Sequence, residues 1–242
     1  MHRRRKATKK ISKCCDIALS DGFEYVWVDT SCIDKTSSAE LSEAINSMYR
    51  WCQHSHVCYA ILSDVPSDED PELEEGWTLQ ELIAPATLIF YGREWKEIGT
   101  KSNLIDIIVQ VSRVHKKVLS GEKELRHCSI AQKMSWASAR RTTRLEDIAY
   151  CLMGIFDVNM PLLYGEDSKA FFRLQEQILN ASLDDSILAW TSHLPAIEKY
   201  DSNQEPGKKS QRRSDTCMSI AHHPTSKSLF GTTQRVSYGR GA

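Results

Sequence analysis

The chain has 242 residues, of which 41% are hydrophobic, and its formal net charge is −1. This length and apolar content suffice for one sizeable domain with a tail, and the balanced charge gives no overall attraction to nucleic acid or an anionic membrane. No apolar run approaches the roughly 20 residues that a bilayer span needs, and the N-terminus has no apolar leader. The eight cysteines lack the spacing of a disulfide framework, so we expect reduced thiols in the cytoplasm.

The first 10 residues are basic, and a helix is expected to follow them. Ile11, Cys14 and Ala18 recur at helical spacing, and Asp21-Gly22 is a turn that ends this helix. The basic segment has the composition of a transit peptide, a nuclear address or a solvated helix start, and the sequence leaves these interpretations open.

A buried strand is predicted at Tyr25–Val28, because all four residues are β-branched or aromatic. The polar residues after it would lie at its C-terminal edge, where open parallel α/β sheets bind ligands. The candidate ligand-binding residues there are Asp29, Thr30, Cys32 and Asp34. The alternative is an ordinary strand-to-helix loop whose Asp and Thr side chains bond their own backbone.

A helix and a second strand are predicted next. Ser37 and Glu40 have capping-box spacing, and the helix that they begin carries an apolar stripe that ends at Cys52. The second strand, Val57–Leu62, is uniformly apolar, and Ser63 follows it. If the two strands are parallel neighbours, Ser63 lies beside the end of the first strand and joins the candidate ligand-binding residues.

Four residue types that bind zinc fall close together, at Cys52, His54, His56 and Cys58. Alternate residues of an extended segment point the same way, and four ligands on one short strand do not surround an ion tetrahedrally. The sequence therefore predicts no metal site.

An acidic segment at 66–75 is expected to be disordered or to face a partner. A short helix from Trp77 to Ala84 follows it, and Pro85 ends that helix. A third strand is predicted at Thr87–Tyr91, and Ser102 is expected to cap the next helix.

The rest of the domain is predicted to be helical after a charged loop at 114–126. One helix is expected over Ser129–Ala139, and a second is expected to begin with a capping box of Thr143 and Glu146. A last amphipathic helix begins at Asp167.

Four segments resemble, in the same order, the HET (heterokaryon incompatibility) domain of fungal proteins. They are YVWVDTSCIDK (25–35), AELSEAINSMYRW (39–51), GWTLQELIAP (76–85) and DIAYCLMGIFDVNMPLLYGE (147–166). The resemblance covers about residues 11–190 and implies a role in fungal self/non-self recognition, in which the HET domain triggers cell death.

Two departures from the family pattern accompany this resemblance. Family members usually carry an upstream strand with a Ser-His-x-Trp-like motif, so the chain is expected to be shortened at its N-terminus. The family also has an Arg where this chain has Glu75. The exchange removes a guanidinium that could bind an anion or pair with a carboxylate.

The segment WTLQEL (77–82) looks like the Trp-Cys-x-x-Glu-Leu segment of Toll/interleukin-1-receptor (TIR) domains. In TIR domains that cleave NAD the Glu is catalytic, so the resemblance implies Glu81 as the catalytic candidate and Trp77 as part of its site. A carboxylate there would stabilise the oxocarbenium-like state through which nicotinamide leaves ribose. The alternative for Glu81 is a surface carboxylate or a structural ion pair. No resident cofactor is expected, and NAD would be a substrate.

We therefore predict an α/β fold with a mainly parallel central sheet of the flavodoxin or TIR type, a helical C-terminal part and a disordered tail. The predicted boundaries are 1–10 for the basic segment, 11–190 for the HET-like domain and 191–242 for the tail, with the α/β part at about 11–112 and the helical part at about 128–190.

The predicted function is that of a cell-death effector in heterokaryon incompatibility. NAD cleavage through Glu81 is one mechanism. A non-enzymatic adaptor that works by homotypic assembly and an inactive truncated member are the alternatives. The expected partners are a second copy or other incompatibility or NLR-type proteins.

Overall fold

The computed structural model of the chain describes residues 2–62, 79–138, 140, 142, 144–189, 217–222 and 234–235, without the side chains of residues 2–10, 30, 217–222 and 234–235. The described strands form one sheet in the order β4-β3-β2-β5-β1-β6. Their bounds are β1 Tyr25–Val28, β2 Val57–Ile61, β3 Leu88–Tyr91, β4 Glu97–Thr100, β5 Cys217–His222 and β6 Gln234–Arg235.

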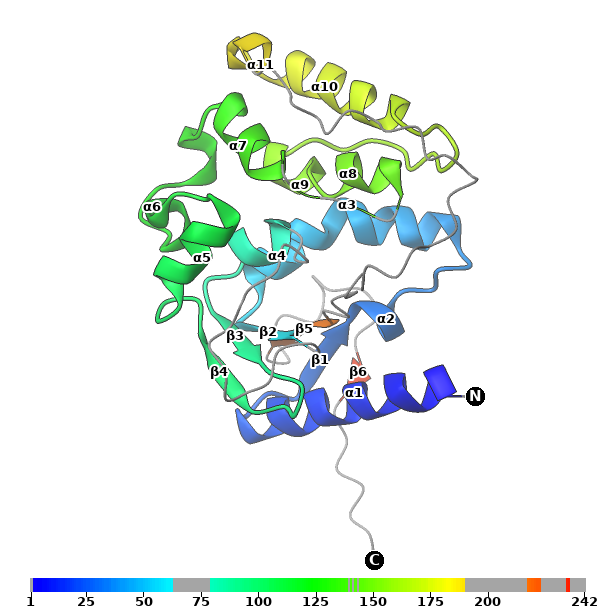
Figure 1. Cartoon of the computed structure of the whole chain (residues 1–242). Helices are drawn as coiled ribbons and strands as arrows, with labels where there is room; N and C mark the ends of the chain where they lie inside the picture. The colour runs from blue at the N-terminus through cyan, green and yellow to red at the C-terminus, as the bar shows by residue number, and fades with distance from the viewer. Residues whose placement is uncertain are drawn as a thin grey trace, which may run out of the picture.

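The helices lie on both faces of this sheet, α1 on one face and the others in successive layers on the opposite face (Figure 1). The first four are α1 His2–Ser20, α2 Asp29–Cys32, α3 Ser38–His54 and α4 Leu79–Ile83. The others are α5 Ile105–Ser112, α6 Lys116–Leu119, a 3-10 turn at Leu125–His127, α7 Ile130–Ala137, α8 Leu145–Tyr150, α9 Met153–Phe156, α10 Lys169–Ala181 and α11 Ser186–Ala189. None of these described helices has the length and apolar character to cross a bilayer.

The two strands predicted as fully buried are confirmed. Every residue of β1 and β2 is buried. Successive side chains alternate between the two faces, so Val26 and Val28 pack in the cluster under α1, whereas Trp27 packs in the larger core, where its ring lies 5.1 Å from that of Trp51 on α3.

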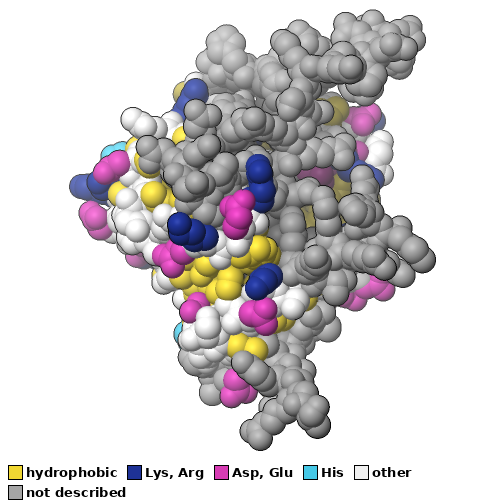
Figure 2. All heavy atoms as spheres, turned by 60° about the horizontal axis from the view of Figure 1, so that its bottom comes forward, with side chains coloured by type: hydrophobic (Ala, Val, Ile, Leu, Met, Phe, Trp, Pro, Cys, Tyr) yellow, Lys and Arg dark blue, Asp and Glu magenta, His cyan; other side chains and the backbone are white. Residues whose placement is uncertain are grey.

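The face that carries α1 holds the smaller of the two clusters. Tyr59 of β2 donates to Asp21 Oδ2 at 2.7 Å, just after the end of α1. Five hydrophobic side chains at the margin of this cluster are only partly buried: Ile11, Ile17, Phe23, Ile89 and Trp95. Figure 2 looks onto this side of the molecule and shows hydrophobic side chains gathered among basic and acidic ones.

The prediction of a mixed α and β fold is confirmed, but the sheet is not mainly parallel. Among the described strands, only β2 and β3 pair in parallel, whereas β4 is antiparallel to β3, β5 is antiparallel to both β1 and β2, and β6 is antiparallel to β1. β1 and β2 therefore run in the same direction, as expected, but β5 separates them. The sequence did not predict β4, because only Gly99 of its four residues is buried and it has no continuous apolar run.

The predicted disorder of the tail does not hold for its two described segments. Residues 217–222 form β5 and residues 234–235 form β6, whereas the remainder of 191–242 lies outside the described residues. A strand as short as β5 does not order itself, but backbone pairing along both of its sides satisfies its N–H and C=O groups. The tail thus contributes to the central sheet.

Helix starts follow the predicted capping chemistry in part. Ser37 Oγ accepts from Glu40 N at 3.3 Å, as expected, but Glu40 Oε1 accepts from Asp34 N at 2.9 Å and not from Ser37. The predicted capping role of Glu146 is wrong. α8 begins at Leu145, and its N-cap residue Arg144 makes no side-chain capping bond. Glu146 Oε1 instead accepts from the N–H groups of Gly165 and Asp167, at 2.7 and 3.3 Å. Thr143, the other residue of the predicted capping box, lies outside the described residues.

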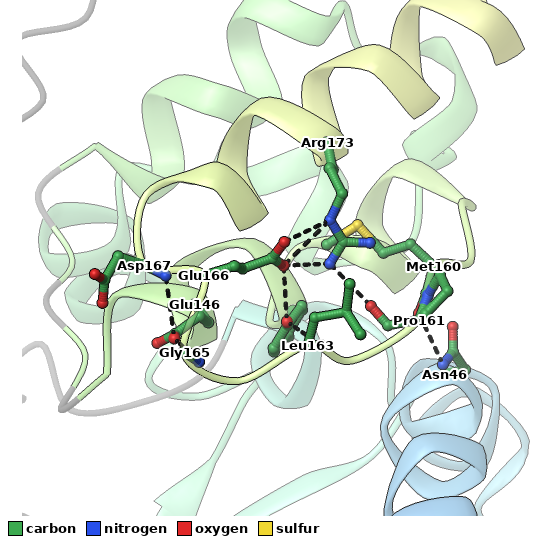
Figure 3. A network of polar contacts seen from close by, with 10 residues as sticks. Asn46, Glu146, Met160, Pro161, Leu163, Gly165, Glu166, Asp167 and Arg173 are labelled. Atoms are coloured by element: carbon green, nitrogen blue, oxygen red, sulfur yellow. Dashed lines mark hydrogen bonds and ion pairs between the residues drawn. The ribbon is translucent and has the colours of Figure 1, made fainter.

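These bonds belong to a network that holds the loop before α10 (Figure 3). Tyr150 Oη accepts from Leu163 N at 2.8 Å and donates to Glu166 Oε1 at 3.2 Å. Arg173 of α10 pairs with Glu166 and also donates to Pro161 O at 3.0 Å. The loop is therefore tied to both α8 and α10.

Gly154 of α9 lies directly against Tyr49 of α3. A Cβ at this position would lie 2.2 Å from Tyr49 Cβ. Because Tyr49 Cβ is fixed to the α3 backbone, the contact relaxes only if one of the two helices moves.

Gly154→Ala should therefore lower the free energy of unfolding by about 2 kcal/mol or more, since overpacking of rigid elements typically costs about 1–3 kcal/mol. Gly22→Ala is the matched control. No atom lies within 4 Å of an added Cβ there, and the positive φ of 86° should cost only about 1 kcal/mol. Urea denaturation of both variants tests the contact, and equal losses would contradict it.

The pairing of β5 gives a second prediction. Ile220 lies opposite Trp27 on one side and Cys58 on the other. Proline has no N–H for a central strand, so Ile220→Pro should destabilise the protein by at least about 3 kcal/mol, whereas Ile220→Val should have little effect. Thermal melting measures both, and an unchanged melting temperature for the proline variant would show that β5 does not support the sheet.

Candidate functional site

The catalytic candidate Glu81 lies on α4, which is held between the sheet and the later helices. Four of the five residues of this helix are buried. The amide of Gln80 donates to Cys151 O at 2.6 Å and to Tyr150 O at 3.4 Å. These bonds fix α4 against the end of α8 and leave Glu81 half-buried.

A buried lysine holds the other end of α4. Lys101, which directly follows β4, donates through Nζ to Leu82 O at 3.4 Å and also to Pro85 O. It thereby satisfies carbonyls at the C-terminus of the helix, where a positive charge is favourable. Burial lowers the pKa of Lys101 to about 8. The hairpin of β3 and β4 thus positions the helix that carries Glu81.

Two carboxylates, on α4 and α8, act on one thiol. Burial, together with the charges of Asp147 and Glu81, raises the pKa of Cys151 to about 12, and the charge of Arg140 opposes this rise. Glu81 follows Gln80, which bonds to Cys151 O, and the Asp147 carbonyl accepts from Cys151 N, so the backbones of both carboxylate residues lie at the same end of α8. The Cys151 thiol stays protonated at neutral pH and is unsuited to act as a nucleophile.

The second carboxylate has a perturbed environment of its own. Tyr164 Oη donates to Asp147 Oδ1 at 3.0 Å, and Arg144 lies over the Tyr164 ring, 4.7 Å from its centre. Burial raises the pKa of Asp147, although the bond from Tyr164 and the charge of Arg144 lower it. A carboxylate whose pKa is raised is a stronger base than an exposed one, as expected of an acid–base group.

We define the carboxylate cluster as Glu81, Asp147, Arg140, Arg144, Cys151 and Tyr164. The sequence indicated only Glu81 of this set. Asp147, Cys151 and Tyr164 belong to the segment 147–166, but no spacing within that segment shows that it packs against α4. Only the folded chain places Asp147 near Glu81.

The polar residues after β1 lie elsewhere. α2 and α4 are near opposite ends of α3 (Figure 1). Glu81 acts on the pKa of Cys52 at the end of α3, and β3 begins soon after α4, so Glu81 lies toward the edge where β2 and β3 start. The sequence predicted that Glu81 lies near Asp29, at the edge of the sheet where the parallel strands end. The structure differs from this prediction.

The candidate ligand-binding residues after β1 make local contacts. Asp29, Thr30 and Cys32 form α2, and Cys32 Sγ accepts from Val28 N at 3.3 Å. Asp34 Oδ1 accepts from Thr36 Oγ1 at 2.6 Å and Thr36 N at 2.9 Å, which lowers the pKa of Asp34. Hydrogen bonds to residues this near in the sequence are typical of an ordinary strand-to-helix loop, which was the alternative interpretation of this segment. The candidates Ser63 and Trp77, and also Glu75, lie outside the described residues.

The four Cys and His residues between α3 and β2 do not converge. Cys52 and Cys58 are buried, whereas His54 and His56 are exposed. Ser55 Oγ lies 3.2 Å from Cys58 Sγ, and His54 Nδ1 lies 2.7 Å from Arg50 O. In the described part of the chain, no group of three or more His, Cys, Asp or Glu side chains is placed to hold a metal ion.

The raised pKa of Asp147 predicts a pH-dependent effect on stability. Asn keeps the acceptor for Tyr164 but carries no charge, so Asp147→Asn should be at least as stable as the parent at pH 7. A raised folded pKa means that the parent loses stability as pH rises through that pKa. The advantage of the variant should therefore narrow as pH falls toward the ordinary Asp value of about 3.9.

Asp106→Asn is the control for this measurement, because Asp106 is exposed and pairs only at the surface with Lys116. It should show no stability gain at pH 7. Thermal melts across the pH range test both variants, and an Asp147→Asn protein less stable than the parent at pH 7 would contradict the burial of this charge.

Comparisons with known proteins show which families the two ends of this chain resemble. Residues 1–87 match the family described as Heterokaryon incompatibility protein (HET), and residues 169–237 match a domain of unknown function, DUF8212. The sequence is 44% identical over 196 residues to the vegetative incompatibility protein HET-E-1 of Podospora anserina, and the match covers 74% of this chain and 14% of that protein. No solved structure matches the chain.

Proposed function

Because the chain belongs to the HET (heterokaryon incompatibility) family, we propose that it acts in vegetative incompatibility as a cell-death effector that hydrolyses the N-glycosidic bond of NAD. One observation carries the chemical part of this proposal. Gln80 donates to Cys151 O at 2.6 Å, so the helix of Glu81 packs on the end of α8, where the Asp147 carbonyl accepts from Cys151 N. Two carboxylates with different environments are the groups that glycosidic hydrolysis requires.

The reaction needs no group beyond these side chains and water. The bond between ribose C1′ and the nicotinamide nitrogen breaks, and its electron pair leaves with nicotinamide, which departs neutral. Positive charge develops on the ribose, where the Glu81 carboxylate stabilises it. Water adds its oxygen to C1′ and gives its proton to Asp147, which releases it to solvent. The products are ADP-ribose, nicotinamide and one proton.

The environments of the two carboxylates fit this division of roles. Asp147 has a raised pKa, which strengthens it as the base that accepts a proton from water. Arg140 supplies a cation next to the carboxylates, suited to the diphosphate of a dinucleotide. The family has an Arg where this chain has Glu75, and Arg140 would take over the binding of the anion.

A second candidate function is that of a non-enzymatic adaptor that works by homotypic assembly. It is favoured by exposed apolar side chains on the outermost helix, among them Phe172 and Leu179. We propose the cytoplasm as its location and a second copy, or other incompatibility or NLR-type proteins, as its partners. An adaptor would kill without consuming NAD.

The test is Glu81→Gln, which keeps the shape and hydrogen bonding of the side chain but removes its charge. It should abolish both NAD cleavage and cell death while changing the free energy of unfolding by less than about 1 kcal/mol. Glu43→Gln, the same change on an exposed position of α3, is the control and should keep both activities. Nicotinamide release by the purified protein and cellular NAD are the measurements.

The outcome also separates the two candidate functions. Full killing by a folded Glu81→Gln protein, with cellular NAD unchanged, would exclude the enzymatic function. In an adaptor, killing would instead depend on exposed helix faces, and a charge reversal such as Glu43→Lys is one variant that could reduce it.

A further inference from the structure

Two neighbouring carboxylates of α8 hold the loop between α9 and α10. Asp147 Oδ1 accepts from Tyr164 Oη at 3.0 Å, whereas Glu146 Oε1 accepts from Gly165 N at 2.7 Å and from Asp167 N at 3.3 Å. Figure 3 shows the bonds from Glu146 to the loop. Because Glu146 fixes the backbone that directly follows Tyr164, the Tyr164 hydroxyl is held beside Asp147.

Contacts of the Tyr164 ring restrain it further. The Arg144 guanidinium lies 4.7 Å from the centre of this ring, and the ring of Tyr150 meets it edge-on at 5.4 Å. A tyrosine side chain has only two rotatable torsions, so contacts of this kind leave its hydroxyl little freedom. The bond to Asp147 is therefore a fixed feature of the loop.

We infer that Tyr164 is a positioning residue for the base Asp147: its hydroxyl fixes Oδ1 and leaves Oδ2 as the oxygen that takes the proton from water. The inference rests on the proposed function, in which Asp147 is that base. In the described part of the chain, no group bonds to Oδ2 of Asp147. A bond to one carboxylate oxygen sets the rotation of the group and leaves the lone pairs of the other available.

The same bond sets the pH at which the base works. A hydroxyl that donates to a carboxylate favours its charged form. Burial raises the pKa of Asp147, and the bond from Tyr164 lowers it against that larger effect. Without the bond the pKa of Asp147 would rise further. The side chain would then stay protonated, and unable to accept a proton, up to a higher pH.

The other charged groups of this region have different roles. Around Asp147 and on the elements packed there, the groups that titrate or carry charge are Arg140, Arg144, Glu146 and Cys151 near α8, Glu166 on the loop, Glu81 on α4 and Arg173 on α10. Arg144 lowers the pKa of Asp147 and Glu146 raises it, whereas Glu166 pairs with Arg173. Among the described residues, Tyr164 alone bonds directly to the Asp147 side chain.

Tyr164→Phe tests this inference in the full chain. Phe keeps the ring and its contacts with Arg144 and Tyr150 but removes the hydroxyl. The kcat for nicotinamide release should fall about tenfold or more, because the base is no longer held in place. KM should change less than about twofold, since no contact with NAD is lost. The pH at which kcat/KM reaches half of its plateau, on the acid side, should move to a higher value.

Tyr150→Phe is the matched control, because Tyr150 holds the same loop without touching Asp147. Its hydroxyl accepts from Leu163 N at 2.8 Å and donates to Glu166 Oε1 at 3.2 Å. This variant should lose thermal stability but keep the acid-side half-point of kcat/KM. A half-point that moves equally in both variants would mean that Tyr164 only supports the loop, and the inference would be wrong.

A measurement without NAD follows the bond directly. The carboxyl carbon of Asp147, assigned by the loss of its NMR signal in Asp147→Asn, should titrate at a higher pH in Tyr164→Phe than in the parent and in Tyr150→Phe. An unchanged titration would overturn the inference, as would an unchanged pH profile of an active Tyr164→Phe protein. Either result leaves the proposed hydrolysis standing, whereas a folded parent that releases no nicotinamide would defeat the hydrolysis itself.

Discussion

The insertion of β5 between β1 and β2 is the constraint on which the rest of this fold depends. β1 and β2 run in the same direction but share no hydrogen bonds, because β5 pairs with both. Each of these buried strands would otherwise lose a row of backbone partners, and buried unpaired N–H and C=O groups are costly. The helices on both faces rest on a sheet that the C-terminal part of the chain completes.

This arrangement also explains how the two family matches relate to each other. The HET match over 1–87 contains β1 and β2, whereas the match over 169–237 contains α10, β5 and β6. Their strands alternate within one sheet. The two segments therefore fold together and are not independent domains, although they are far apart in the sequence.

The carboxylate cluster depends on the packing of short helices against one another. Gln80 joins α4 to the end of α8, Lys101 holds the carbonyls that end α4, and Gly154 lets α9 approach α3. Each contact involves a buried polar group or a missing side chain, so each tolerates little change.

Several features of this protein were determined by local sequence alone. Uniform apolar runs specified β1 and β2, and Ser37 and Ser129 each cap the helix that follows. These signals act within a few residues, so at these positions they did not depend on distant parts of the chain.

Other features were decided only by tertiary structure. The order and direction of the strands depended on residues 217–222, which lie within the tail that the sequence predicted to be disordered. Glu146 has the spacing of a helix cap but bonds to Gly165 and Asp167, and Gln80 of α4 bonds to the backbone at the end of α8. Sequence pattern reports which face of an element is apolar, whereas the partner of that face is set by the lowest free energy of the whole chain.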